Sequence, residues 1–279
     1  MNIYSPQLIR DVLTPLGFHF SKARGQNFLI DELIPERMAD LIPPGSGVLE
    51  IGPGFGALTE KLLDTADGLV AVEVDNRLAP VLRARYHDQT HFTLVEGDAL
   101  ALDLDALAAE HFDGLTPRVA ANLPYSITSD ILTKLVESPS YASMLLMVQK
   151  EVALRLTASP GKKDYGSFTI FVRVFCEAEL LFDVPPESFM PRPGVMSAVM
   201  RLIRREAPLV PPEMQARFFR VTRAAFAQRR KTLLNALSAG FSEKSKEEIA
   251  AALERAGLDT QIRGETLGVE EFLRLTNEI

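Results

Sequence analysis

The sequence predicts an α/β fold in which helices cover both faces of a mostly parallel, doubly wound sheet, followed by a small all-helical domain. Three observations predict this fold class. Short apolar runs alternate with amphipathic stretches up to about residue 200, which is the pattern of βα units. A glycine-rich segment follows the first apolar run directly, as at the ligand-binding turn of such folds. Beyond residue 212 only helical spacing is found.

Seven apolar runs are expected to form strands: 47–51, 69–74, 92–95, 118–121, 143–149, 168–176 and 195–203. Apolar residues at helical spacing predict helices over 31–41, 56–64, 76–86, 126–137 and 150–157. No convincing helix separates the last two strands, so we expect an antiparallel hairpin joined by the proline-rich loop 184–194 and hence a mixed edge. Ligands of such a sheet bind at the carboxyl ends of its strands.

The chain changes character near residue 207. Residues 207–212 (APLVPP) form an expected linker, since their prolines oppose continuation of a strand or helix. Helical patterns follow at roughly 213–226, 229–239, 245–256 and 269–278, with Ser242 or Ser245 as an expected N-cap. We therefore expect two domains, residues 1–206 and residues 207–279.

Composition limits the classes of function. The 279 residues are 47% hydrophobic and 24% charged without a biased tract, as in an ordinary globular protein. Cys176 is the only cysteine, which excludes an intrachain disulfide and favours a reducing compartment. Neither a signal peptide nor a long apolar run is found. We expect a cytoplasmic monomer without membrane contact or bound metal.

Charge is distributed unevenly along the chain. The formal net charge of −7 by itself argues against a polyanionic partner. Residues 201–231, however, contain nine basic and two acidic side chains, so this segment carries +7 and the remainder −14. Such segregation can give an acidic protein a positive face, although a charged helix is more often just solvated. The pair Lys162–Lys163 is interpreted as an exposed, mobile loop tip, with an RNA contact as the less favoured alternative.

A glycine loop and an acidic residue indicate an adenosine-containing cofactor. Residues 52–60 (GPGFGALTE) join the first strand to a helix, and such a turn brings backbone N–H groups close to a ligand. Glu73 lies 21 residues after Gly52, where a carboxylate can accept hydrogen bonds from ribose hydroxyls. The loop fits both the dinucleotide pattern G-x-G-x-x-A and the G-x-G-x-G pattern of S-adenosylmethionine enzymes. Asp98, after the third strand, can accept from an adenine amino group or cap a helix.

Residues 122–125 (Asn-Leu-Pro-Tyr), at the end of the fourth strand, indicate chemistry on an adenine amino group. That nitrogen is a poor nucleophile because its lone pair is delocalised into the ring. The Asn122 side-chain oxygen and a neighbouring backbone carbonyl can accept its two N–H bonds and leave the lone pair facing a methyl donor. Pro124 stiffens the backbone at Leu123, and Tyr125 can stack on a flipped or single-stranded base.

These motifs resemble, in order and over nearly the whole chain, those of the KsgA/RsmA family of small-subunit (16S) rRNA adenine N6,N6-dimethyltransferases. The resemblance also rests on the segments 25–29 (GQNFL), 149–153 (QKEVA), 165–167 (YGS), 184–193 (VPPESFMPRP), 195–202 (VMSAVMRL) and 225–232 (AFAQRRKT). It implies a Rossmann-like S-adenosylmethionine-dependent methyltransferase domain and a helical rRNA-binding domain. The implied reaction dimethylates two adjacent adenosines in the 3′-terminal hairpin of 16S rRNA, within the small ribosomal subunit or its precursor.

The resemblance also implies roles for individual residues. Cofactor contacts fall to Gln26, Asn27, Leu29, Gly52, Gly54, Glu73, Asp98, Ala99 and Asn122. The implied catalytic residues are Asn122, Leu123, Pro124, Tyr125 and Phe189, with Tyr125 and Phe189 on opposite faces of the target adenine, although a phenylalanine between prolines is more often a packing residue. RNA contacts fall to Arg192, Arg220, Arg223, Arg229, Arg230 and Lys231. Gly194 departs from the basic residue common in the family, and Arg192 is near enough to substitute.

Three alternatives stay open on the sequence alone. The first is a large-subunit rRNA adenine methyltransferase of the antibiotic-resistance type, against which the segments 189–193 and 228–232 weigh. The second is a non-catalytic RNA-binding or assembly factor with the same fold, against which the retained glycine loop and Asn122 weigh. The third is a nicotinamide-dependent oxidoreductase, which leaves the 122–125 corner unexplained.

Overall fold

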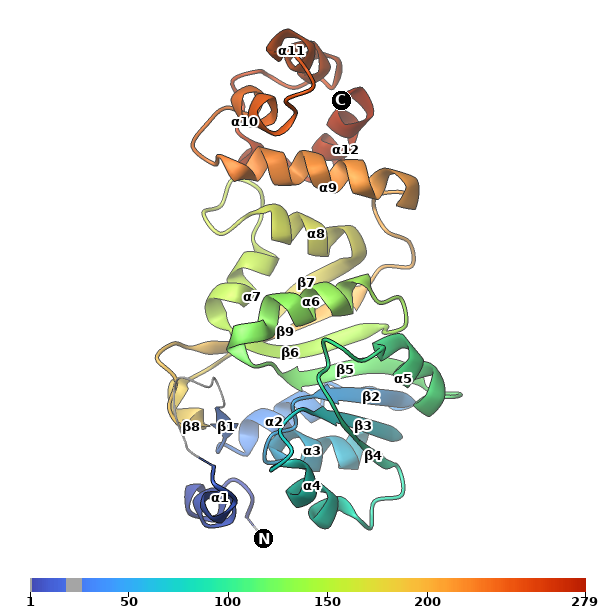
Figure 1. Cartoon of the computed structure of the whole chain (residues 1–279), viewed down its shortest axis with the longest axis vertical. Helices are drawn as coiled ribbons and strands as arrows, with labels where there is room; N and C mark the ends of the chain where they lie inside the picture. Colours follow the sequence, from blue (N-terminus) through green and yellow to red (C-terminus); the bar gives the residue numbers. More distant parts are fainter. Residues whose placement is uncertain (1, 19–26) are drawn as a thin grey trace. The chain divides into compact units, whose positions relative to one another are not determined.

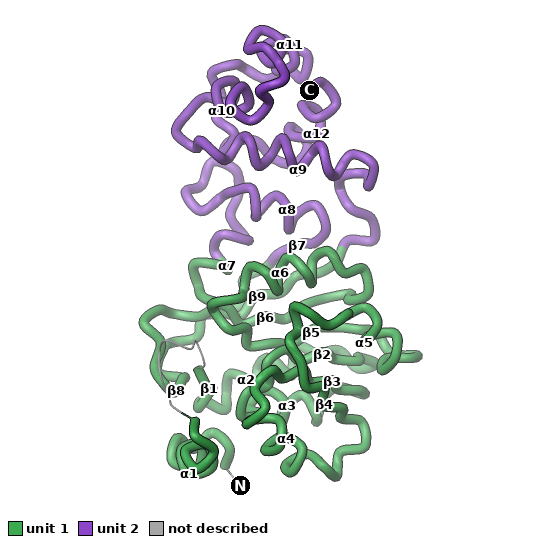
Figure 2. Tube along the Cα trace, in the orientation of Figure 1, with its two compact units in different colours: residues 1–153, 179–204 green, residues 154–178, 205–279 purple. Residues whose placement is uncertain are grey.

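The chain forms two compact units in the computed structural model, which describes residues 2–18 and 27–279 (Figures 1 and 2). Unit 1 comprises residues 1–153 and 179–204, and unit 2 comprises residues 154–178 and 205–279. This division differs from the expected domains 1–206 and 207–279, because residues 154–178 belong with the C-terminal helices.

A seven-stranded sheet with the order β4-β3-β2-β5-β6-β9-β7 organises unit 1. The strands are β2 (Ser46–Ile51), β3 (Gly68–Glu73), β4 (Phe92–Glu96), β5 (Thr116–Asn122), β6 (Ser143–Gln149), β7 (Cys176–Val184) and β9 (Ser197–Arg204). The pairs β2–β3, β3–β4, β2–β5 and β5–β6 are parallel, and β9 runs antiparallel to β6. The predicted mostly parallel sheet with an antiparallel edge is confirmed.

Helices alternate with the parallel strands, as the βα pattern predicts. They are α2 (Leu33–Ala39), α3 (Ala57–Thr65), α4 (Ala79–Tyr86), α5 (Leu104–His111), α6 (Thr128–Glu137) and α7 (Lys150–Thr157), preceded by α1 (Pro6–Leu13). All six residues of β2 are buried, which requires cover on both faces of the sheet and explains why apolar and exposed polar residues do not alternate along this strand. The sequence pattern did not predict α1 or α5.

Residues 168–176 form a helix, so the predicted strand is wrong. Helix α8 spans Ser167–Phe175. The strand that lies beside β9 in the sheet is β7, which begins directly after α8. The run FTIFVRVFC is rich in β-branched and aromatic residues that favour strands. Ile170 and Val174, however, lie one helical turn apart and are both fully buried in the core of unit 2, so packing of a helical face overrides the local propensity.

Unit 2 also contains the four predicted C-terminal helices, α9 (Pro212–Ala227), α10 (Leu233–Gly240), α11 (Lys246–Arg255) and α12 (Val269–Glu278). Phe218 of α9 and Phe272 of α12 are fully buried and meet edge to face with ring centroids 6.5 Å apart. Helix α9 begins at Pro212, since a proline in the first helical turn sacrifices no hydrogen bond. Ser245 caps α11 by accepting from the Glu248 N–H, as one of the two expected caps.

The topology brings three strand ends together in unit 1. Strand β2 lies between β3 and β5 and is parallel to both, so their carboxyl ends share one edge of the sheet at the point where the strand order reverses. A short antiparallel pair, β1 (Phe28–Leu29) with β8 (Phe189–Met190), adds a second small sheet. None of the helices in the described residues has the length and hydropathy of a membrane-spanning segment.

Candidate active site

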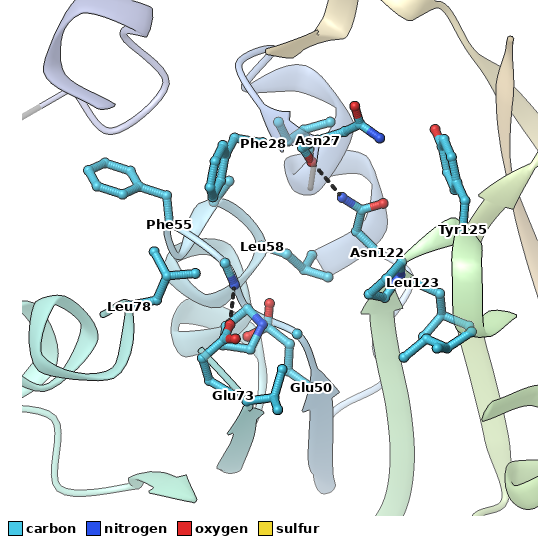
Figure 3. Close-up of a pocket in the computed structure, with 18 of the residues that line it drawn as sticks. Asn27, Phe28, Glu50, Phe55, Leu58, Glu73, Leu78, Asn122, Leu123 and Tyr125 are labelled. Carbon is cyan, nitrogen blue, oxygen red and sulfur yellow. Dashed lines mark hydrogen bonds between the residues drawn. The ribbon is translucent and has the colours of Figure 1, made fainter. Parts of the chain in front are cut away.

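A pocket of about 270 Å³ opens at the carboxyl ends of β2, β3 and β5 (Figure 3). Its lining residues fall within four segments of unit 1: 27–29, 50–58, 73–78 and 122–127. The volume is close to the lower end of the usual range for small-molecule sites. The pocket brings together nine of the predicted cofactor and corner residues, which are Asn27, Leu29, Gly52, Gly54, Glu73, Asn122, Leu123, Pro124 and Tyr125.

The glycine loop forms the floor of this pocket between β2 and α3. Gly52, Gly54 and Gly56 have φ values of 69°, 59° and 89°, a left-handed region that residues with a Cβ rarely adopt. The Gly52 N–H donates to the Val72 carbonyl at 2.9 Å, which fixes the start of the loop against β3. The loop therefore exposes backbone rather than side chains to a ligand.

Glu73 ends β3 and is locked to the glycine loop. One carboxylate oxygen accepts from the Gly54 N–H at 3.1 Å and the other from the Asp75 N–H at 2.9 Å. Burial raises the pKa of Glu73, while these backbone N–H groups oppose the rise. Each carboxylate oxygen has a second lone pair, so a hydroxyl group in the pocket can donate to an oxygen whose position is already set.

Glu50 is a pocket residue that the sequence reasoning missed. It is 1% exposed in β2, and its carboxylate accepts from the Thr59 hydroxyl at 2.7 Å. Burial raises the pKa of Glu50 to about 8, the Thr59 hydrogen bond lowers it, and the charge of Glu73 raises it. A single acid in an otherwise apolar, fully buried strand was the available signal, because such a group is costly unless it has a function or a partner.

The polar side chains of the pocket select among cofactors. Two carboxyl groups line it, whereas no Lys, Arg or His is found among its described lining residues. Such a site opposes the pyrophosphate of a dinucleotide and suits a ligand with positive charge and hydroxyl donors. S-adenosylmethionine has a sulfonium, an ammonium and two ribose hydroxyls, so the pocket favours one of the two cofactors that the glycine pattern left open.

The corner after β5 presents hydrogen-bond acceptors. The Asn122 side-chain nitrogen donates to the Asn27 carbonyl at 3.4 Å, so its oxygen points away from Asn27 and toward Tyr125 (Figure 3). The Pro124 carbonyl is occupied, since it accepts from the Ile127 N–H at 3.3 Å and from the Thr128 hydroxyl at 2.9 Å. The acceptors available beside the pocket are therefore the Asn122 side-chain oxygen and the Leu123 carbonyl.

Tyr125 stands at the open side of this corner. Its ring lines the pocket, and its hydroxyl shares a hydrogen bond of 2.6 Å with the hydroxyl of Ser197, the first residue of β9. Burial raises the pKa of Tyr125 and the Ser197 bond lowers it. The ring is held at both ends, by the backbone after Pro124 and by the antiparallel strand β9. Ser197 is a second site residue that the sequence reasoning missed.

Other predicted site residues lie outside the pocket. Asp98 is exposed after β4 and accepts from the Leu100 N–H at 2.9 Å, and the adjacent Ala99 is buried. Phe189 is only 2% exposed: it pairs with Leu29 across β1 and β8 and belongs to the core of unit 1. Its ring faces are therefore covered by packing in this structure, which does not agree with the predicted stacking on a target base. Gln26 lies outside the described residues.

The predicted RNA-contacting side chains fall into two groups. Arg192 pairs with Glu187, Arg220 pairs with Glu243 at 2.6 Å, and Arg229 donates to the Lys163 carbonyl at 2.7 Å. Arg223, Arg230 and Lys231 are exposed and form no ion pair within the described residues. Only the second group is free to meet phosphate without breaking an existing contact.

A buried pair of carboxyl groups suited to a cationic nucleoside, next to hydrogen-bond acceptors suited to an amino group, is the arrangement expected of an S-adenosylmethionine-dependent methyltransferase acting on nitrogen. Comparison with known proteins agrees. Residues 17–279 match the family described as ribosomal RNA adenine dimethylase, and the chain belongs to this family.

Two full-length relatives are similar to the whole chain. The chain is 45% identical to "Ribosomal RNA small subunit methyltransferase A" of Geobacillus thermodenitrificans, covering 100% of this chain and 97% of the relative. It is 42% identical to the protein of the same name from Alkaliphilus metalliredigens, covering 99% and 98%.

Two solved structures share the fold along most of the chain. The 23S rRNA methyltransferase ErmE has a TM-score of 0.69 at 28% identity, covering 90% of this chain and 99% of its own. A dimethyladenosine transferase from Plasmodium falciparum has a TM-score of 0.68 at 25% identity, covering 97% and 94%.

Proposed function

We propose that this enzyme dimethylates N6 of two adjacent adenosines in the 3′-terminal hairpin of 16S rRNA, within the small ribosomal subunit or its precursor. The observation that carries the proposal is the corner at Asn122, whose acceptors flank a pocket suited to a cationic nucleoside. The choice of the small subunit is supported by relatives at 42–45% identity that carry that name over nearly their full length. The 23S rRNA methyltransferase ErmE has a lower sequence identity to this chain, 28%.

The Asn122 oxygen and the Leu123 carbonyl accept the two N–H bonds of the target adenine. This localises the lone pair of the amino nitrogen and aims it at the cofactor pocket. Bound S-adenosylmethionine supplies the methyl group. Tyr125 holds the base by stacking, which offsets the stacking that the base loses when it leaves its RNA neighbours. A strong general base is not required, since the amino group becomes acidic as the new bond forms and loses its proton to water.

The remaining predicted residues have supporting roles in this proposal. Glu73 accepts from the ribose hydroxyls, and Asn27, Leu29 and the glycine loop contact the rest of the cofactor. Asp98 and Ala99, after the neighbouring strand β4, are proposed to contact its adenine. Exposed basic residues of the C-terminal helices hold RNA phosphates without reading sequence. We propose that the chain acts as a monomer in the cytoplasm, where its RNA substrate is assembled.

The test is methyl transfer from labelled S-adenosylmethionine to unmethylated small subunits and, in parallel, to large-subunit RNA, followed by nucleoside mass analysis. N6,N6-dimethyladenosine in the small-subunit RNA alone is the expected result. Labelling confined to large-subunit RNA would favour the resistance-type enzyme. Cofactor binding without transfer to either RNA would favour a non-catalytic assembly factor.

A further inference from the structure

Residues 2–18, which we call the N-terminal segment, pack against the pocket without lining it. They contain α1 and the short helix η1 (Thr14–Leu16) and belong to unit 1 (Figure 1). The Tyr4 hydroxyl donates to the Ala57 carbonyl at 3.0 Å, and the rings of Phe18 and Phe28 meet with their centroids 5.4 Å apart. Ala57 and Phe28 both line the pocket, whereas none of residues 2–18 does. The N-terminal segment therefore supports the pocket wall.

Arg77 connects the N-terminal segment to the turn that follows β3. Its guanidinium donates to both carboxylate oxygens of Asp75, at 2.8 and 2.5 Å. The third guanidinium nitrogen donates to the Gly17 carbonyl at 3.3 Å, and the central carbon lies 4.6 Å from the centre of the Phe18 ring. An arginine can make such a set of contacts because its donors point in fixed directions and its flat face attracts an aromatic ring.

Asp75 extends this connection to Glu73 in the pocket. The Asp75 N–H donates to a Glu73 carboxylate oxygen at 2.9 Å, while the Asp75 carboxylate accepts from the Arg77 N–H at 3.0 Å. The turn between β3 and α4 is therefore fixed at one end by Glu73 and at the other by Arg77. Loss of the Arg77 contacts loosens the turn that carries the donor for Glu73.

The Arg77–Asp75 pair differs from an ordinary surface ion pair. The side chains of Arg77 and Asp75 are 27% and 10% exposed. Arg83 of α4 also pairs with an acid at 2.5 Å, but the side chains of Arg83 and Glu96 are 56% and 42% exposed. Exposed pairs contribute little because solvent screens them, whereas a shielded pair with two parallel hydrogen bonds holds a defined geometry. Arg83 is therefore a matched comparison for Arg77.

We propose that Arg77 is a positioning residue for the cofactor, because it couples the packing of the N-terminal segment to the orientation of the Glu73 carboxylate. Cofactor binding and packing of the segment then stabilise each other, since a coupling between two sites acts equally in both directions. Arg77 itself lies outside the pocket lining. This inference rests on the proposed contact between Glu73 and the ribose of the cofactor.

The first test measures the dissociation constant of S-adenosylmethionine by isothermal titration calorimetry, without RNA. Arg77→Ala should weaken binding about five- to tenfold. Arg77→Lys keeps the charge but not the planar fork, so it should weaken binding nearly as much. Arg83→Ala, the matched control, should bind like the wild type. Wild-type affinity in Arg77→Ala would overturn the proposal, and wild-type affinity in Arg77→Lys would show that charge alone is sufficient and that the fork positions nothing.

A double variant tests whether the effect passes through Glu73. In the Glu73→Gln background, Arg77→Ala should change the affinity less than about twofold, because the two residues act on the same contact. A full additional loss would overturn the coupling. The single variant Glu73→Gln separates this inference from the proposed ribose contact. Wild-type affinity in Glu73→Gln would remove both, whereas a weakened Glu73→Gln beside an unaffected Arg77→Ala would overturn the coupling alone.

Hydrogen exchange of the N-terminal segment tests the coupling in the other direction. The Gly17 and Phe18 N–H groups donate to the carbonyls of Thr14 and Leu13 at 3.0 and 3.1 Å. Saturating S-adenosylmethionine should slow the exchange of these two amides in the wild type and in Arg83→Ala, but not in Arg77→Ala. A purely structural role of Arg77 would not change the response to cofactor. Equal exchange in the wild type with and without cofactor would overturn the proposal.

Discussion

The hydroxyl oxygens of Tyr125 and Ser197 lie 2.6 Å apart, and this hydrogen bond connects the corner after β5 to the antiparallel strand β9. Ser197 is fully buried and is the register partner of Gln149 on β6. The position of the Tyr125 ring therefore depends on β9, the last segment of unit 1 in the sequence. In the proposed reaction, this ring sets the plane of the target base.

Ser197→Ala should lower the rate of methyl transfer about five- to tenfold, because one hydrogen bond of about 1 kcal/mol no longer orients the ring. Tyr125→Phe removes the same bond and keeps the stacking face, so it should have a similar effect. The double variant should be no slower than either single variant. Ser197→Thr, which retains a hydroxyl, should restore most of the rate. Additive effects of the two substitutions would show that the bond is not the cause.

Glu73→Gln should weaken S-adenosylmethionine binding by about ten- to a hundredfold, since hydrogen bonds to a charged acceptor contribute about 1.5–3 kcal/mol. Isothermal titration calorimetry gives the dissociation constant. Glu96→Gln is a matched control, because Glu96 is the register partner of Glu73 at the end of the neighbouring strand and lies outside the pocket. Equal losses in both variants would indicate a general charge effect and not a ribose contact.

The pH dependence of stability should report on Glu50. Burial raises its pKa to about 8 in the folded protein, above the value near 4.5 of an unfolded chain. Its favourable contribution is therefore complete below about pH 4.5 and is lost as pH rises toward 8. Glu50→Gln cannot ionise, so its free energy of unfolding does not contain this loss. The free energy of unfolding of the variant minus that of the wild type, measured by urea denaturation without cofactor, should therefore increase by about a few kcal/mol between pH 5 and 8. A constant difference over this range would contradict the raised pKa.

Phe189→Ala should destabilise unit 1 by about 3–5 kcal/mol, as expected for truncating a buried aromatic residue. Phe189→Leu fills most of the same volume and should cost less than about 1.5 kcal/mol. Because Phe189 is a buried residue of β8 and belongs to the core of unit 1, the leucine variant should transfer methyl groups at close to the wild-type rate. A folded leucine variant with transfer reduced more than about tenfold would instead support stacking of Phe189 on the target base.

Much of the fold could be predicted because buried faces of strands and helices require apolar residues at regular spacing in the sequence. Strands β2 to β6 are apolar runs bounded by turn residues, and α9 to α12 show clear helical spacing. Helix α8 could not be distinguished locally, because its β-branched residues favour a strand and only its packing in unit 2 selects the helix. The pair β1–β8 has two residues in each strand, which is too short for any period to show.

The site could be predicted where a functional residue directly follows a strand. Glu73 and Asn122 end β3 and β5, so parallel pairing alone brings them to one edge. Ser197 could not be found in this way, since its contact with Tyr125 depends on the register between β9 and β6. Phe189 is the opposite case, because its motif indicates a base contact while its side chain is buried in the core of unit 1.

The role of Asn122 is best measured by single-turnover methyl transfer to unmethylated small subunits at saturating S-adenosylmethionine, comparing wild type with Asn122→Ala and with the exposed-site control Asn277→Ala. Removal of an acceptor that acts on the reacting nitrogen should slow transfer at least about a hundredfold, with RNA binding unchanged and the control at the wild-type rate. Transfer by Asn122→Ala within a few-fold of wild type would contradict the assignment of this corner as the catalytic site.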